Sequence, residues 1–466
     1  MALPRSKVSA FAARRSALLA RLSGPALLAA GQPQARNFRN NTHRFRASSH
    51  FLYLLGAAIP GAALLFARGE AQLFAPAPES DDALWHGVQP SFSDLKATHE
   101  LAAVRPLEEL QDAIRDAGGT VATLPTEDAA SASWLSSVLG RRILPGTGNM
   151  IADGTPDHAL ALAMIALRLH HDAAAIDQLR AAAEASAQAH VVGMRATRGA
   201  QHEWEIAAAM IGELRRHHLD DAYSPIVTVH GEVLHNPHHD NAVAAGDLLL
   251  ADVGGETPEG WAADITRVWP VSGAFSPTQR AIYEVVLGAQ EAAIARVTKG
   301  TRYREVHETA GRTLVAGLRD LGIFKGEVDG LYERGAAAIF FPHGVGHLLG
   351  LDVHDLEDLG DRAAYAPGRV RSERFGDRYL RLDLDLAPGM AVTIEPGFYQ
   401  VPAILADASL TGAVGSDLDR EVLARFADVR GIRIEDDVLC TEGAPEVLTR
   451  AAPKSIAAVE ATMANQ

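Results

Sequence analysis

Residues 248–269 read LLLADVGGETPEGWAADITRVW, and this stretch decides the fold of the C-terminal half of the chain. Two apolar runs, LLLAD and WAADI, flank a turn rich in glycine, proline and glutamate, which is the pattern of a β-hairpin. Because successive strand residues point to opposite faces, a paired hairpin can bring Asp252 and Asp264 to the same side. The stretch therefore predicts a hairpin that presents two carboxylates together.

Three later segments each place a potential metal ligand among distinctive neighbours: His347 in HGVGHLLGLDVHD, Glu395 in TIEPGFY and Glu435 in GIRIEDDV. Each glutamate follows a β-branched run, so we expect it to project from a strand. Taken singly, an aspartate is more often a turn cap, a glutamate can be an edge residue, and His347 is more often a core histidine. The whole set favours a metal site.

Four carboxylates and one imidazole carry too much negative charge to be buried together without cations. The sequence therefore predicts two divalent metal ions. Such a donor set suits Mn²⁺ best, with Zn²⁺, Co²⁺ or Fe²⁺ as alternatives. Two ions about 3.5–4 Å apart can share a hydroxide nucleophile and polarise a carbonyl, which predicts a dinuclear metallohydrolase.

Composition limits the partners and the location of the protein. The 466 residues carry a formal net charge of −15, which argues against nucleic acid as a partner because phosphate binding needs a basic face. The sequence has no apolar run of about 18 residues, so no membrane span is expected. Cys440 is the only cysteine, so an internal disulfide is excluded, and we expect a cytoplasmic protein.

The first part of the chain is basic, since it has no aspartate or glutamate before Glu70. Such a start resembles a transit peptide, and Arg14 and Arg15 weakly resemble an export signal. The alternative is mature structure, with a first amphipathic helix over 11–22 and a buried strand over 26–30. We favour mature structure, because Arg21 interrupts any apolar run of the signal type.

Residues 1–165 alternate short apolar runs with loops and predict a smaller α/β domain with a mixed sheet. The runs at 61–67 and 71–77 are expected to be strands joined by a turn around Gly69. A helix is expected over 99–119, followed by a strand over 120–124.

Residues 166–466 predict a larger α+β domain. Helices are expected over 158–218, with a gap near 197–199, and again over 277–297 and 303–322, with strands between and after them. The Arg- and Asp-rich stretch 360–385 is expected to be a solvated insertion. Residues 406–430 are expected to form a loop and a short helix.

The chain resembles the proline-specific pita-bread metallopeptidases, the group of aminopeptidase P and prolidase (Xaa-Pro dipeptidase). The N-terminal motif RNFRNNTHRFRASSHFLYLLG, at 36–56, resembles the arginine-rich, aromatic-strand signature of the family, and Trp85-His86-Gly87 resembles its W-x-G element. The resemblance implies a C-terminal pita-bread catalytic domain and an N-terminal domain that serves oligomerisation and closes the substrate entrance. It also implies a homodimer or homotetramer.

The resemblance further implies roles for individual residues. Asp252 would bind one ion, His347 and Glu395 the other, and Asp264 and Glu435 would bridge them. His235, His343 and His354 would line the substrate pocket and serve catalysis together with Glu395 and Arg433, although His343 and His354 could instead brace the metal ligands. Arg433 would orient the carboxylates or bind substrate, and Thr266 would support a ligand. His238 and His239 are expected to be solvated.

Two departures from the family pattern do not remove a ligand. The interval from Asp252 to Asp264 is one residue longer than usual, and we expect the extra residue at the hairpin tip, 257–259. Asn236 and Pro237 replace the usual tyrosine or alanine after the VLH motif, which would reshape the substrate mouth.

The expected substrates are small peptides with proline at the second position, because the bond before proline is a tertiary amide that general peptidases cleave poorly. The N-terminal motif favours aminopeptidase P, which acts on longer peptides. The long segment between Glu395 and Glu435 favours prolidase, and so does Arg381, at the position where prolidases bind the C-terminal carboxylate of a dipeptide. An ordinary surface arginine is the alternative for Arg381. We favour a dipeptidase.

Three other interpretations remain open from the sequence: a non-enzymatic pita-bread binding module, a metal-free hydrolase of the creatinase type and a methionine aminopeptidase. The first two should lack part of the carboxylate set, which is complete here. The third normally lacks a large N-terminal domain. The sequence does not predict the physiological metal or the preferred residue before proline.

Overall fold

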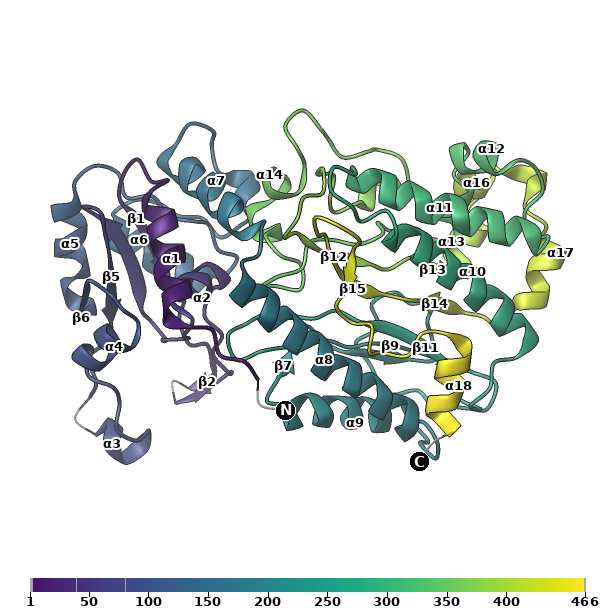
Figure 1. Ribbon diagram of the computed structural model, residues 1–466, viewed down its shortest axis with the longest axis horizontal. Helices are drawn as coiled ribbons and strands as arrows, with labels where there is room; N and C mark the ends of the chain where they lie inside the picture. Colours follow the sequence, from purple (N-terminus) through teal and green to yellow (C-terminus); the bar gives the residue numbers. More distant parts are fainter. Residues whose placement is uncertain (1–2, 39, 80, 465–466) are drawn as a thin grey trace. The chain divides into compact units, whose positions relative to one another are not determined.

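The computed structural model describes residues 3–38, 40–79 and 81–464 (Figure 1). They form two compact units. The N-terminal unit contains Arg5–Ala175 and a returning segment, Asp355–Ala363, whereas the C-terminal unit contains mainly Ile176–His354 and Ala364–Gln466. The change between the predicted domains, at 165 and 166, lies inside helix α7 (Pro156–Arg168) of the N-terminal unit. Nothing in the sequence pattern predicted the returning segment.

The N-terminal unit is built around a mixed sheet with the strand order β1-β4-β5-β6. Antiparallel pairing joins β1 (Ala26–Ala29), β4 (Ala63–Ala67) and β5 (Glu70–Ala75), and β6 (Ala103–Pro106) runs parallel to β5. The predicted strand pair β4–β5 is confirmed, and Arg68 and Gly69 form its turn with positive φ angles. A separate short hairpin joins β2 (Ala35–Phe38) and β3 (Asn41–Thr42).

Apolar side chains on one face of this sheet pack against helices α5 (Leu110–Ala117) and α6 (Ala129–Leu139). Their common core contains alternate residues of one strand, Ala63 and Leu65, as strand geometry requires. The expected first helix is present as α1 (Val8–Leu19).

Two sequence-based expectations for this unit were wrong, and one apolar run had no predicted structure. That run, 51–55, belongs to helix α2 (Ser49–Leu55), all of whose residues are buried. A helix that is apolar on every side lacks the periodic signal that separates helix from strand. The helix expected over 99–119 begins only at α5, because β6 occupies its first half and proline disfavours helix at the residue before it. Within 120–124, Ala122 makes only an isolated bridge to Ala26.

In the C-terminal unit the strands lie between two successive pairs of helices (Figure 1). The pairs are α8 (Ala173–Ala196) with α9 (Glu203–Arg216), and α10 (Pro277–Ile294) with α11 (Tyr303–Asp320). The predicted gap near 197–199 and the α+β class are confirmed. The sheets that carry the site have the strand orders β11-β9-β8, β12-β15-β16 and β13-β14. Their strands are β8 (Ile226–Thr228), β9 (Leu248–Asp252), β11 (Thr266–Pro270), β12 (Ala391–Ile394), β13 (Gly397–Tyr399), β14 (Gly431–Arg433), β15 (Asp436–Leu439) and β16 (Glu446–Val447).

The stretch 360–385 is not simply a solvated insertion, so that expectation was wrong. Leu380 and Leu382 are fully buried. The buried carboxylate of Asp383 accepts hydrogen bonds from Arg302 at 2.7 and 2.6 Å. A charged composition favours a solvated segment, but ion pairing with Arg302, distant in the sequence, buries Asp383. For 406–430, where a loop and one short helix were expected, the structure has loops and two short helices, α16 (Ala408–Thr411) and α17 (Arg420–Leu423).

Within the described part of the chain, no single helix is long and apolar enough to cross a membrane. Helices α7 and α8 meet the criteria of length and composition only as a pair, with a bend of 67° between them.

Candidate metal centre

The two aspartates lie on the predicted hairpin. Strand β9 pairs antiparallel with β11 and places Asp252 opposite Thr266. Asp264 lies two residues before β11 begins, and a hydrogen bond of 3.0 Å from the Val253 N–H to the Ile265 carbonyl continues the pairing there. The Asp264 N–H itself donates to the carboxylate of Asp437 at 3.1 Å. Backbone pairing of the hairpin therefore positions Asp252, and Asp264 is positioned by the paired Ile265 beside it and by Asp437.

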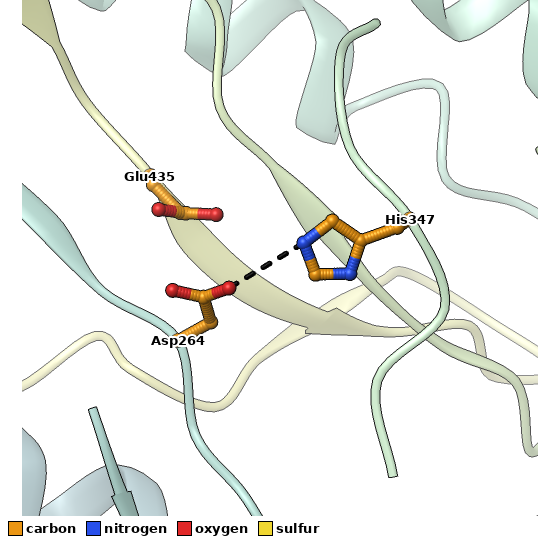
Figure 2. Close-up of side chains that lie close together, drawn as sticks. All are labelled: Asp264, His347 and Glu435. Carbon is orange, nitrogen blue, oxygen red and sulfur yellow. Dashed lines mark ion pairs between the residues drawn. The ribbon is translucent and has the colours of Figure 1, made fainter. Parts of the chain in front are cut away.

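The other three candidate ligands come from distant segments and meet the hairpin. Asp264, His347 and Glu435 point toward one another (Figure 2), and one potential ligand atom from each lies within 4.8 Å of the others. His347 Nε2 is 3.4 Å from Asp264 Oδ2 and 3.9 Å from Glu395 Oε1. Arg433 joins Asp252 to the group, since its Nη2 donates to Asp252 Oδ2 at 2.5 Å. The structure thus brings all five candidate ligands together.

The local structure of three of these residues differs from the expected strands. His347 lies in an irregular segment after helix α13 (Ala336–Phe340), where only its neighbour Leu348 makes an isolated bridge. Glu395 follows β12 directly, and Glu435 lies between β14 and β15. Ligands just outside strand ends can converge because the strands on either side fix the backbone.

The orientation of His347 leaves one ring nitrogen for a cation. Its Nδ1 lies 3.0 Å from the Leu348 carbonyl oxygen, which can only accept a hydrogen bond. Nδ1 therefore carries a proton, and Nε2 faces the carboxylates, where it can bind a cation once it gives up its own proton.

Burial makes the ionised carboxylates costly. It raises the pKa of Glu395 to about 7 and the pKa of Glu435 well above its usual range, and the neighbouring carboxylates add to both shifts. Burial also raises the pKa of Asp252. Among the described residues no hydrogen-bond partner lies at Asp252 Oδ1, although this oxygen is buried. A repelling set of buried oxygens with an open acceptor fits divalent cations, which supply the missing positive charge.

Hydrogen bonds hold the carboxylates in place. Thr266 Oγ1 donates to Glu435 Oε2 at 2.7 Å. The Arg433 guanidinium donates through Nε to Thr266 Oγ1 at 3.0 Å and through Nη1 to the Tyr399 hydroxyl at 3.0 Å. The buried guanidinium of Arg433 therefore contacts Asp252, Thr266 and Tyr399 around the centre.

Sequence reasoning missed two residues of this network, Tyr399 and Asp437. Tyr399 reaches the centre because β13 pairs with β14, and no local pattern indicates that pairing. Asp437 had a weak signal, because it is one of two aspartates directly after Glu435.

The three predicted pocket histidines line one cavity with the metal ligands. Burial, with the charge of Arg433, lowers the pKa of His343 to about 3, and burial lowers the pKa of His235. The charge of His347, whose ring centre is 4.2 Å away, lowers the pKa of His354 to about 2, and burial adds to the shift. These imidazoles are therefore neutral near pH 7 and can exchange hydrogen bonds with a substrate.

The cavity has a volume of about 850 Å³ and is lined by residues of the C-terminal unit. Arg381 lines it, and its role in substrate binding stays a prediction. His239 was expected to be solvated. It is half-buried, and its Nε2 lies 3.0 Å from the Pro225 carbonyl oxygen. Sequence reasoning missed much of the remaining wall: Tyr223, Ile404, Arg371, Phe375, Arg378 and Tyr379.

Comparison with known proteins identifies the family. The pattern of metallopeptidase family M24 matches residues 177–442, which include all five candidate ligands. This chain belongs to metallopeptidase family M24. The N-terminal domain of aminopeptidase P matches residues 11–123. The chain is thus a metallo-exopeptidase with the two-domain, pita-bread architecture.

The M24 peptidase is similar over nearly its whole length to proteins named as Xaa-Pro aminopeptidases. A probable Xaa-Pro aminopeptidase of Penicillium rubens is 33% identical over 89% of this chain and 88% of its own length. One of Talaromyces stipitatus is 32% identical over 88% of this chain and 86% of its own.

Solved structures agree with this relationship. Aminopeptidase PepP of Pseudomonas aeruginosa superposes with a TM-score of 0.79 at 31% identity and covers 99% of this chain and 98% of its own. Proline aminopeptidase P II of Yersinia pestis has a TM-score of 0.80 at 29% identity, over 98% of this chain and 100% of its own. The earlier preference for a dipeptidase finds no support in these relatives.

Proposed function

We propose that this M24 peptidase is an Xaa-Pro aminopeptidase, which removes the first residue from peptides longer than a dipeptide when proline is second. The observation that carries the proposal is the match to Xaa-Pro aminopeptidases over about nine-tenths of the chain, including an N-terminal domain of the aminopeptidase P type. The cavity of about 850 Å³ supports it, because this volume is near the upper end of the range for small-molecule pockets and has room for more than two residues.

The carboxylate set would hold two divalent cations, with Mn²⁺ preferred on ligand chemistry. The residues that would hold these ions are Asp252, Asp264, His347, Glu395 and Glu435. When bound, the ions supply the Lewis acidity that polarises the scissile carbonyl and acidifies the attacking water.

The residues of the chain perform the remaining steps. Glu395, a buried carboxylate at the centre, accepts the proton of the attacking water and delivers it to the proline nitrogen of the leaving group. The neutral imidazoles of His235, His343 and His354 donate or accept hydrogen bonds along the substrate backbone. Arg433 and Thr266 keep the carboxylates oriented, and neither needs to change its protonation state.

Peptide length and metal dependence test the proposal together. The protein is treated with a chelator, Mn²⁺ is added back, and kcat/KM is measured for the peptides Ala-Pro, Ala-Pro-Ala and Ala-Ala-Ala. We expect metal-dependent cleavage of Ala-Pro-Ala, with much slower cleavage of the other two. Faster cleavage of Ala-Pro would restore the dipeptidase interpretation and a carboxylate-binding Arg381. No metal-dependent cleavage of any peptide would refute the proposal.

We also propose a homodimer or homotetramer with a cytoplasmic location. The support is the resemblance in the N-terminal domain and the lone, buried Cys440. Light scattering of the purified protein would measure the oligomeric state, and a monomer at micromolar concentration would contradict it.

A further inference from the structure

One wall of the cavity is basic. The lining residues contributed by the segment 371–381 are Arg371, Phe375, Arg378, Tyr379 and Arg381, and none of them is acidic. The acidic residues that line the cavity are those of the metal centre: Asp252, Asp264, Glu395 and Glu435. The cavity therefore has an acidic end, where cations belong, and a basic wall.

The guanidinium of Arg378 packs against two aromatic rings. Its guanidinium carbon lies 4.8 Å from the ring centre of Tyr379 and 5.6 Å from that of Phe375. Its Nη2 donates to the Tyr379 hydroxyl at 2.6 Å. Among the described residues no carboxylate lies within ion-pair distance of Arg378, which is exposed to solvent. The guanidinium is thus oriented by stacking, yet keeps donors for a ligand.

The turn that carries Arg378 is anchored to the rest of the C-terminal unit. Arg378 is the middle residue of the 3₁₀ turn η4 (Asp377–Tyr379). The Asp377 carboxylate lies 3.6 Å from His307 Nε2 and 3.7 Å from Arg374 Nη1. Before it, Gly376 has a φ of 85° and so little space toward Ala338 that a side chain there would clash at 2.7 Å. The fold therefore fixes the backbone from which the Arg378 side chain extends.

We propose that Arg378, with Phe375 and Tyr379, forms a specificity subsite for a carboxylate on the C-terminal side of the substrate proline. This inference rests on the proposed Xaa-Pro aminopeptidase activity and names the substrate class that the activity prefers. The carboxylate is either the C-terminus of a tripeptide or the side chain of an acidic third residue, because both offer the same group to a guanidinium.

Charge decides the direction in which the substrate lies. The free α-amino group of an aminopeptidase substrate is a cation near neutral pH, and the basic wall repels it. The amino terminus therefore lies away from the basic wall, and the part of the peptide after proline extends toward Arg378. A carboxylate there forms a charge-assisted hydrogen bond with the arginine.

A set of four peptides tests the subsite with the Mn²⁺-loaded, full-length enzyme. The peptides are Ala-Pro-Ala with a free C-terminus and the amides Ala-Pro-Ala-NH₂, Ala-Pro-Glu-NH₂ and Ala-Pro-Lys-NH₂. We expect kcat/KM for the free acid or the Glu amide to exceed that for the neutral amide by about fivefold, mainly through a lower KM, because an exposed charge pair contributes about 1 kcal/mol or less. We expect the Lys amide to be the poorest substrate. The free acid and the Glu amide show separately which carboxylate is used.

The variant Arg378→Gln should reduce this preference to about one, whereas Arg378→Lys should keep part of it. The matched control is Arg319→Gln, an exposed arginine of α11 that pairs with its neighbour Asp320 and does not line the cavity. It should keep the wild-type ratio. The preference of the wild type should also shrink as salt is added, because salt screens exposed charges.

Three outcomes separate the possible failures. If the wild type does not cleave the neutral amide or any other peptide of the set, the proposed function fails. If it cleaves all four at similar rates, or if Arg378→Gln keeps the full preference for a carboxylate, only the subsite is overturned.

Discussion

Replacing Asp383 with asparagine should destabilise the C-terminal unit by about 2 kcal/mol. The fully buried carboxylate accepts two hydrogen bonds from Arg302, at 2.7 and 2.6 Å, and one from Arg304 at 3.2 Å. A charge-assisted hydrogen bond contributes about 1.5–3 kcal/mol. The expected loss of stability lies near the lower end of this range, although three hydrogen bonds are affected. Both arginines reach solvent and can be rehydrated, and asparagine keeps one acceptor.

The matched control is Asp385→Asn. Asp385 is 57% exposed and pairs with Arg369, so its replacement should change the free energy of unfolding by less than about 0.5 kcal/mol. The measurement is urea unfolding at pH 7. The midpoint and slope of the transition of the C-terminal unit give its free energy of unfolding. Equal losses of unfolding free energy in the two variants would show that the buried pairing of Asp383 stabilises the protein no more than the exposed pairing of Asp385.

The pH dependence of the free energy of unfolding, compared between the wild type and Asp383→Asn, gives a second check. Burial alone would raise the pKa of Asp383, but the hydrogen bond from Arg302 and the charge of Arg304 outweigh it, so the folded-state pKa lies below 3.8. A carboxyl with a lowered pKa stabilises the folded state above its unfolded-state pKa and loses that contribution as pH falls through the folded-state pKa. The difference between wild type and Asp383→Asn should therefore be constant from pH 7 to 5 and shrink only below about pH 4. A difference that vanishes by pH 5 would refute the assignment.

Three further predictions concern the metal centre. The variant Thr266→Val removes the hydrogen bond to Glu435 and should lower Mn²⁺ affinity or kcat by about 10- to 100-fold, which metal titration and kinetics will separate. The variant Asp264→Asn should abolish metal-dependent hydrolysis but raise the melting temperature of the chelator-treated protein, because it removes one of four mutually repelling carboxylates. The variant Tyr399→Phe removes hydrogen bonds to His343 and Arg433 and should lower kcat severalfold more than it changes KM.

Each of these predictions has an outcome that contradicts it. For Thr266→Val it is an unchanged Mn²⁺ titration together with unchanged kcat. For Asp264→Asn it is a lower melting temperature without metal, which would mean that the carboxylate stabilises the empty site. For Tyr399→Phe it is a change confined to KM.

The candidate ligands were predictable because each lies within a short segment whose spacing follows from local geometry. The hairpin that carries Asp252 and Asp264 needs only two apolar runs and a turn, and the same holds for the strand pair β4–β5 of the N-terminal unit. Repulsion among buried carboxylates then indicates cations without any knowledge of distances. For these features the sequence alone was sufficient.

The cavity wall and the support of the metal centre were decided by the tertiary structure. The stretch 360–385 has the composition of a solvated loop, yet pairing with Arg302 buries Asp383, and five residues within 371–381 line the cavity. Tyr399 contacts Arg433 only because β13 pairs with β14, although about 30 residues separate the two strands in the sequence. The sequence determined which residues could bind metal, because that chemistry and its strand spacing are local. The tertiary structure decided what surrounds them, because contacts between distant segments depend on how the whole unit packs.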